Sequence, residues 1–153
     1  MLGILLVWHL LSAVIWVGGM FFAYMALRPV VAEVLEPPQR IALWVGVFAR
    51  FFPWVWLCVL LLLVTGHGML FVSFGGFESL NGSLLSMMVI GWLMVVVFAV
   101  VVFGPFKHMK KALAEQNFPQ GAVHLANIRR LIAFNLILGL LQVVIGEGGK
   151  YVF

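Results

Sequence analysis

Four long runs of apolar residues, separated by short polar stretches, account for most of the chain. Each run reaches the roughly 20 residues that a helix needs to cross the hydrocarbon core of a bilayer. The runs predict helices over about 2–27, 40–72, 84–106 with an extension to about 116, and 120–146. Short connections favour antiparallel neighbours. The pattern therefore predicts an all-α fold, an integral membrane antiparallel four-helix bundle that forms a single domain over residues 1–153.

Proline and glycine residues predict where these helices end or bend. Pro29 and the prolines at 37–38 bracket the first connection, whose middle part is expected to form a short surface helix. Pro53 is expected to kink the second helix, and Pro105 the end of the third. The glycine-rich tail after Gly146 is expected to stop the fourth helix.

The composition excludes a soluble globular domain. Hydrophobic residues make up 65% of the chain and charged residues 9%, whereas soluble domains average about 45–50% and about 25%. The formal net charge of +4 comes from the connections, where it indicates membrane orientation and not a nucleic-acid partner. All five acidic residues are glutamates in the connections or at helix ends, which argues against hydrolysis by paired carboxylates.

The basic residues are distributed unevenly between the two sides of the predicted bundle. Eight of the nine lysines and arginines lie in or beside the first and third connections, and only Lys150 lies on the other side. The positive-inside rule then places these connections in the cytoplasm and both termini on the periplasmic side of a bacterial inner membrane. The lipid bilayer is the predicted partner, and assembly of several copies into a homo-oligomer stays open.

His9 and His67 are ionisable residues within apolar runs, and such residues at membrane depth indicate a functional role. His9 lies roughly 12 Å, and His67 roughly 8 Å, from the predicted periplasmic ends of their helices. Similar depth would allow both imidazoles to bind one metal. Facing histidines in a helical bundle suit haem b. The alternative is that each histidine forms an interhelical hydrogen bond and binds no metal.

Met69 and Arg50 complete the set of predicted binding residues. The thioether of Met69 lies close to His67 in sequence, and thioethers bind Cu(I). Arg50 is predicted either to bind an anionic group, such as a haem propionate or a quinone-like ligand, or to extend towards the lipid headgroups. Asn135 has a matching depth in the fourth helix, where an amide can hold two helices together.

His108 and His124 lie near the predicted cytoplasmic ends of the third and fourth helices. They form a conceivable second metal pair. Their basic neighbours, which include Lys107 and Arg130, favour instead a solvated surface that faces lipid headgroups.

Three stretches of the chain resemble the copper-resistance protein D (CopD) family in its short stand-alone form. They are HLLSAVIWVGGMFFAYMALRP at 9–29, ARFFPWVWLCVLLLLVTG at 49–66 and IRRLIAFNLILGLLQVVIG at 128–146. More distantly, the chain is similar to the HemJ-type protoporphyrinogen oxidases, four-helix membrane proteins that have a histidine in the first helix and bind haem b. The resemblance implies an inner-membrane protein linked to copper uptake or to haem-dependent redox chemistry.

These observations leave three functions open. The first is a haem b protein that transfers electrons or oxidises a small hydrophobic substrate, with His9, His67 and Arg50 at the cofactor and a quinone or another redox partner. It would make the chain a membrane haem-dependent oxidoreductase. The second is a Cu(I) uptake or homeostasis protein with His9, His67 and Met69 as ligands. The third is a structural membrane subunit without a cofactor. An absorption spectrum and a metal analysis of one preparation would separate them.

Overall fold

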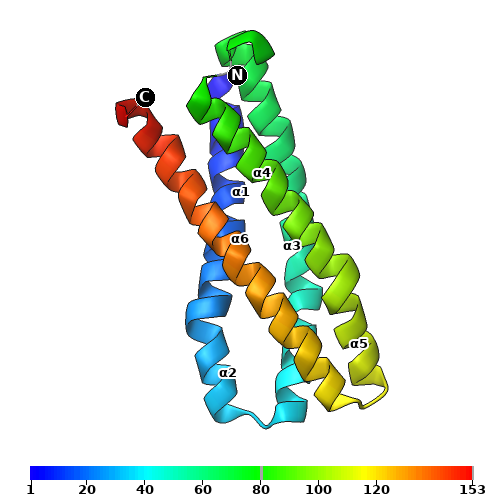
Figure 1. Ribbon diagram of the computed structural model, residues 1–153. Helices are drawn as coiled ribbons and strands as arrows, with labels where there is room; N and C mark the ends of the chain where they lie inside the picture. Colours follow the sequence, from blue (N-terminus) through cyan, green and yellow to red (C-terminus); the bar gives the residue numbers. More distant parts are fainter. Residues whose placement is uncertain (80, 153) are drawn as a thin grey trace.

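The computed structural model describes residues 1–79 and 81–152, without the side chains of 74, 79 and 147–152. In this part of the chain, four helical spans pack into a bundle, and each is long and apolar enough to cross a membrane (Figure 1). The elements are α1 (Leu2–Phe22), the π-helical η1 (Ala23–Leu27), α2 (Arg28–Val34), α3 (Pro37–Phe74), the short 3-10 helix η2 (Phe77–Ser79), α4 (Gly82–Val101), the π-helical η3 (Val102–Phe106), α5 (Lys107–Ala114) and α6 (Phe118–Val152). The predicted all-α fold with four spans is confirmed.

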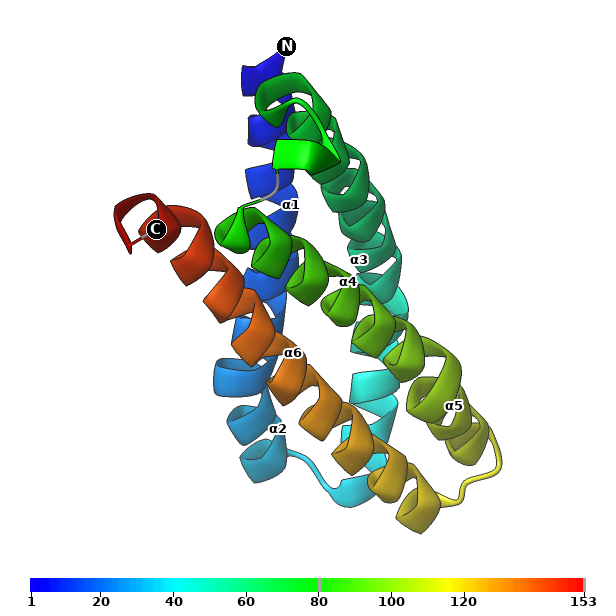
Figure 2. The same ribbon diagram turned by 45° about the horizontal axis from the view of Figure 1, so that its top comes forward.

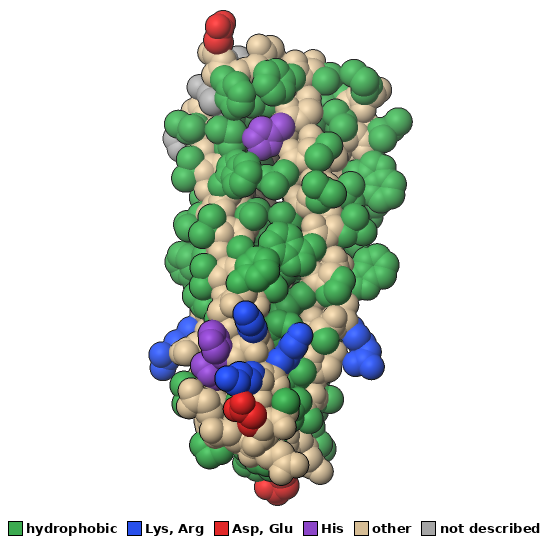
Figure 3. Space-filling model, turned by 90° about the vertical axis from the view of Figure 1, so that its right-hand side faces the viewer, with side chains coloured by type: hydrophobic (Ala, Val, Ile, Leu, Met, Phe, Trp, Pro, Cys, Tyr) green, Lys and Arg blue, Asp and Glu red, His purple; other side chains and the backbone are tan. Residues whose placement is uncertain are grey.

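Consecutive spans run in opposite directions, so the connections alternate between the two ends of the bundle (Figures 1 and 2). The N-terminus, the end of α6 and the 3-10 helix η2 lie at one end, which we call the terminal end. The connections at 35–36 and 115–117 lie at the other, which we call the basic end. Figure 3 shows lysine and arginine side chains gathered towards one end, beside a broad hydrophobic surface. An apolar belt of this kind is what a bilayer requires.

The first span is longer than the sequence predicts. The helix does not break at Pro29 but continues through the π-helical turn η1 into α2, which ends at Val34. Pro29 lies in the first turn of α2, where a missing N–H group is tolerated. The connection to α3 therefore shrinks to Leu35 and Glu36. Arg40 closes it, since its Nε and Nη2 atoms donate to the carbonyl oxygens of Leu35 and Ala32, at 2.5 and 2.7 Å.

The other helix boundaries follow local capping chemistry. α3 begins with a capping box, in which the Gln39 side chain accepts from the Glu36 N–H group at 3.1 Å. It passes Pro53 as one continuous helix and ends at Gly75, whose φ of 79° lies in the left-handed region. α6 extends to Val152, so the glycine-rich tail does not stop it at Gly146 as predicted.

Aromatic side chains fill the half of the bundle nearer the basic end. The ring of Phe52 stacks on Phe48 and meets Phe98 and Phe106 edge-on, with centroid distances between 4.9 and 5.4 Å. Outside this aromatic cluster, small residues allow the helix backbones to approach closely. A Cβ atom at Gly139 of α6 would lie 2.8 Å from the Val17 side chain of α1. The spans are therefore closely packed along the middle of the bundle.

Candidate functional site

His9 lies on the face of α1 that packs against α3. Its Nδ1 atom is 2.9 Å from Oγ1 of Thr65. A Cβ atom at Gly66 would be 3.3 Å from the Cε1 atom of His9, and one at Gly68 would be 3.4 Å from the side chain of Leu5. The absence of a side chain at Gly66 therefore lets the imidazole lie directly against the backbone of α3.

The hydrogen bonds of Thr65 determine which nitrogen of His9 carries the proton. The Thr65 hydroxyl donates its single proton to the carbonyl oxygen of Leu61, because a carbonyl oxygen can only accept. The Thr65 oxygen must then accept from His9, which places the imidazole proton on Nδ1. The Nε2 atom keeps its lone pair, and no hydrogen bond to it occurs among the described residues. A metal-binding histidine typically has this arrangement, with one nitrogen held and the other free.

His67 lies on another side of α3. Its Nδ1 atom donates to the carbonyl oxygen of Leu63 at 2.8 Å, and its ring meets Trp92 of α4 at a centroid distance of 6.2 Å. Residues two apart in an α-helix are separated by about 200° around its axis. Thr65 is thus directed towards α1 and His67 towards α4. The structure does not bring the imidazoles of His9 and His67 together, and a metal role for His67 stays a prediction.

Met69 shares the α1-facing side of α3 with Thr65. The two residues are four apart, so they differ by only about 40° around the helix axis. Met69 is half-buried and lies one turn closer to the terminal end than Thr65. His9 and Met69 therefore belong to one interface, between α1 and α3, the pair of elements with the most extensive contact in the described structure.

Two further sulfur atoms lie deeper along the same interface. Met20 follows His9 by 11 residues, and Cys58 precedes Thr65 by seven, and both separations return to nearly the same helix face. Their exposed fractions are 4% and 3%, within one buried core cluster. Across the described residues, no group of three or more His, Cys, Asp or Glu side chains could hold one metal ion. The interface thus offers a series of separate soft ligands and not a closed metal site.

Arg50 and Asn135 do not pair. Arg50 is exposed, and its Nη1 atom donates to the Gly46 carbonyl oxygen at 3.1 Å, one turn towards the basic end. This direction matches the predicted extension towards headgroups. Asn135 is 3% exposed and lines a central cavity of about 30 Å³ with Trp16 and Met20. Its Oδ1 atom has no hydrogen-bond partner in the described part of the chain. A cofactor role for Arg50 stays a prediction.

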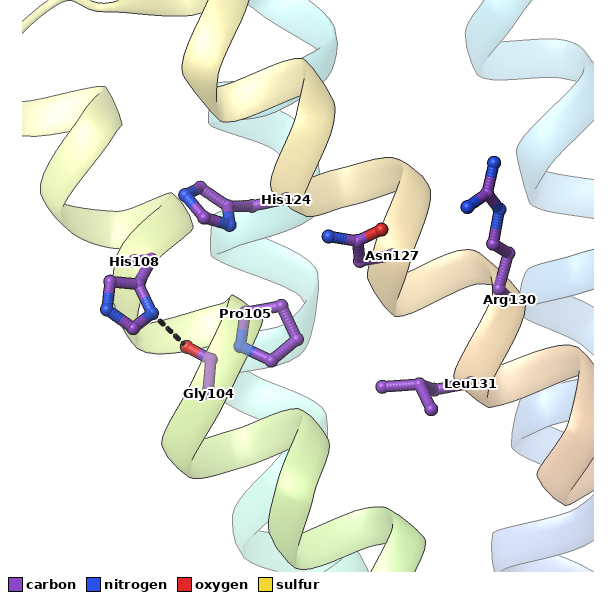
Figure 4. A pocket seen from close by; sticks show the side chains of 7 residues that line it. All are labelled: Gly104, Pro105, His108, His124, Asn127, Arg130 and Leu131. Atoms are coloured by element: carbon purple, nitrogen blue, oxygen red, sulfur yellow. Dashed lines mark hydrogen bonds between the residues drawn. The ribbon is translucent and has the colours of Figure 1, made fainter.

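His108 and His124 meet at the basic end. Their rings stack at a centroid distance of 5.3 Å with an angle of 24° between planes. The Nδ1 atom of His108 donates to the Gly104 carbonyl oxygen at 2.8 Å. Both rings line an open groove between η3–α5 and α6 (Figure 4). The sequence offered this pair only as an alternative to a solvated surface, and a metal role for it stays a prediction.

Comparison with known families decides the identity of the bundle. The sequence model of the family described as Copper resistance protein D, CopD, matches residues 45–146. The chain belongs to the CopD family. No curated protein and no solved structure matches it. Family membership and four apolar spans identify it as a multi-pass protein of the bacterial inner membrane and associate it with copper.

The matched region holds only part of the α1–α3 interface described above. Thr65, Met69 and Cys58 fall within it, whereas His9 and Met20 precede it. Neither Thr65, the partner of His9, nor the buried Cys58 was among the residues predicted for the site. One signal for Thr65 was available, because a lone hydroxyl at the depth of a membrane-embedded imidazole is a natural hydrogen-bond partner.

Proposed function

We propose that this CopD-family protein takes up Cu(I) at the terminal end and conducts it along the α1–α3 interface. His9 is the first imidazole ligand, and Met69 is its neighbouring thioether. Cys58 and Met20 continue the series towards the middle of the membrane. Copper is the cargo and stays Cu(I) throughout, so no electron donor or acceptor is needed.

The observation that carries this proposal is the hydrogen bond between His9 and Thr65. It holds the imidazole against α3 and leaves its Nε2 lone pair free. Imidazole and thioether or thiolate sulfur are ligands that suit copper, and sulfur selects the Cu(I) state. His9 and Met69 lie in the same interface, on the side that the basic-residue distribution assigns to the periplasm.

The arrangement of the deeper ligands favours passage over storage. A tight closed site would release copper slowly, whereas a series of separate ligands allows exchange from one to the next. Cys58 and Met20 are both almost fully buried, so water cannot compete for a bound ion there. The small cavity beside Met20, with the unpaired Asn135 oxygen, supplies space of about one water volume at the end of this series.

Haem b binding, with a quinone or another redox partner, has weaker support. His9 and His67 do not fit as axial ligands to one haem, because they contact different sides of α3. The central cavity of about 30 Å³ is also far smaller than a porphyrin. Arg50 binds its own helix backbone and not a pocket for a propionate. Haem-dependent oxidation therefore ranks behind copper uptake.

The test is a Cu(I) competition titration with a chromophoric chelator, on purified protein in detergent, for wild type, His9→Gln and the matched control His67→Gln. We expect His9→Gln to weaken Cu(I) binding at least about tenfold and His67→Gln to change it less than about twofold. Copper accumulation in cells that express each variant should follow the same order. Unchanged affinity in His9→Gln would overturn the proposal. A Soret band that copurifies with wild type and is lost in His9→Gln would favour haem instead.

A further inference from the structure

The groove between η3–α5 and α6 has a volume of about 470 Å³ and lies outside the α1–α3 interface. It is lined by residues of contrasting character, among them His108, His124, Asn127, Arg130 and Leu131. The π-helical turn η3 widens the helix beside it, and π-helical turns are frequent at functional sites. A Cβ atom at Gly104 would meet nothing within 4 Å, so the floor of the groove is open.

We propose that this groove binds the headgroup of one anionic phospholipid, with the phosphate held by Arg130 and Asn127 beside the two histidines. This lipid site is independent of copper uptake and concerns the interaction of the bundle with the bilayer.

The groove changes from polar to apolar along its length. Figure 4 shows His108 and His124 facing each other across one end, Asn127 in the middle and Leu131 at the far end. Leu131 follows Asn127 by one helical turn in the direction of the membrane centre. This change in polarity matches a phospholipid in a bilayer, whose phosphate lies further from the membrane centre than its glycerol and acyl chains.

Hydrogen-bond donors suited to phosphate lie along the groove. Arg130, next to Leu131, is exposed and carries a planar set of N–H groups that bind phosphate in a bidentate manner. Figure 4 shows its side chain on the side of α6 away from the two histidines, so its guanidinium must turn to share a phosphate with Asn127. It is not engaged by a carboxylate, because the one ion pair found among the described residues joins Lys111 to Glu115. Asn127 is exposed and contributes an amide. Lys107, next to His108, adds positive charge without an acidic partner in the described structure.

The same geometry argues against a metal ion in this groove. The two imidazole planes are nearly parallel, at 24°, so their in-plane lone pairs do not converge on one point. No third His, Cys, Asp or Glu ligand joins them within the described residues. The surrounding charges are positive, which repels a cation and attracts an anion.

The depth of the groove identifies its occupant as a lipid. His108 lies six residues before the end of α5 and His124 six residues after the start of α6, roughly 9 Å from these ends. The groove opens on the outside of the bundle at this depth, where the bilayer interface and its phosphates lie. Basic grooves between transmembrane helices on the cytoplasmic side are a known type of site for anionic headgroups.

The test uses native mass spectrometry of the full-length protein, released from detergent after addition of phosphatidylglycerol or phosphatidylcholine. We expect one phosphatidylglycerol per chain to be retained preferentially, and Arg130→Gln to weaken its binding about tenfold, the loss of one charge-assisted hydrogen-bonded pair. Asn127→Ala should weaken it by a smaller factor. The matched control is Arg50→Gln, which removes the same charge from an exposed arginine near the same end but outside the groove, and should change binding less than about twofold.

Three outcomes would overturn the proposal. Equal weakening by Arg130→Gln and Arg50→Gln would mean that binding of phosphatidylglycerol depends on the net charge of the protein and not on the groove. Equal retention of phosphatidylcholine would remove the selectivity for anionic lipid. Binding of inorganic phosphate that depends on Arg130, without retention of phosphatidylglycerol, would replace the lipid by a soluble phosphate. Circular dichroism of both arginine variants should be unchanged, because both side chains are exposed.

Discussion

His9 donates its Nδ1 proton to the hydroxyl oxygen of Thr65 across the α1–α3 interface, at 2.9 Å. The Thr65 hydroxyl in turn donates a hydrogen bond to the carbonyl oxygen of Leu61, which completes a directed chain of hydrogen bonds. One threonine therefore controls both the orientation and the tautomer of an imidazole within the membrane. The proposed copper site can be tested through this threonine without changing the ligand itself.

Replacing Thr65 by valine keeps the side-chain shape but removes the acceptor for His9. We expect Thr65→Val to weaken Cu(I) binding about tenfold, as loss of a partner that orients a metal-binding histidine typically does. Unfolding should become easier by about 1–3 kcal/mol, because the Nδ1–H group is left unpaired in an apolar interface. Thr65→Ser retains the hydroxyl and should stay close to wild type in the same chelator titration and thermal melt. Equal losses in both variants would show that the methyl group of Thr65 matters, and not its oxygen.

Cys58 should matter for passage of copper and not for its first capture. We expect Cys58→Ala to leave the Cu(I) affinity of purified protein within about twofold of wild type, because His9 and Met69 are intact. Uptake of copper by cells that express Cys58→Ala should fall severalfold, since sulfur is the soft donor that suits Cu(I) at this depth. Val59→Ala is the control, because Val59 is equally buried at 3% and its truncation also leaves a cavity. Similar copper uptake by the two variants would show that Cys58 is not a ligand on the copper path.

Adding a single methyl group at Gly139 should lower the stability of the bundle. A Cβ atom there would lie 2.8 Å from Cγ2 of Val17 and 3.3 Å from Cε of Met94. Val17 is β-branched and stiff in a helix, so it cannot rotate away easily. We expect Gly139→Ala to destabilise the bundle by about 1–3 kcal/mol, measured as a lower midpoint of thermal unfolding in detergent. Gly18→Ala is the control, because a Cβ atom there would meet nothing within 4 Å, and it should be neutral or slightly stabilising.

Asn135 should be dispensable for stability. Its Oδ1 atom is buried without a partner among the described residues, which carries a desolvation penalty of about 1–3 kcal/mol. We expect Asn135→Leu to raise the thermal midpoint of the protein, since leucine also fills part of the adjoining cavity. If the amide is the last group on the copper path, uptake should fall even as stability rises. A lower midpoint in Asn135→Leu would mean that the amide oxygen has a stabilising partner.

The spans of this protein could be predicted from its sequence because they depend only on the length of each apolar run. The positions of helix ends near Pro29 and Gly146 were wrong, since a proline in a first helical turn and glycines in a tail are both compatible with continued helix. The rotation of each helix could not be predicted, because an apolar pattern on all sides gives no preferred face. For this reason the sequence paired His9 with His67, whereas the structure places His9 against Thr65.

The link between α2 and α3 has only two residues, Leu35 and Glu36, and the side chain of Arg40 ties it back to α2. A tether this short keeps the first two spans together at the basic end, whereas their terminal ends are not linked directly. The tether therefore acts as a hinge, and the interface that holds the proposed copper ligands can widen only by opening at the terminal end. A crosslink between α1 and α3 near the terminal end should thus block copper uptake more effectively than one near the tether.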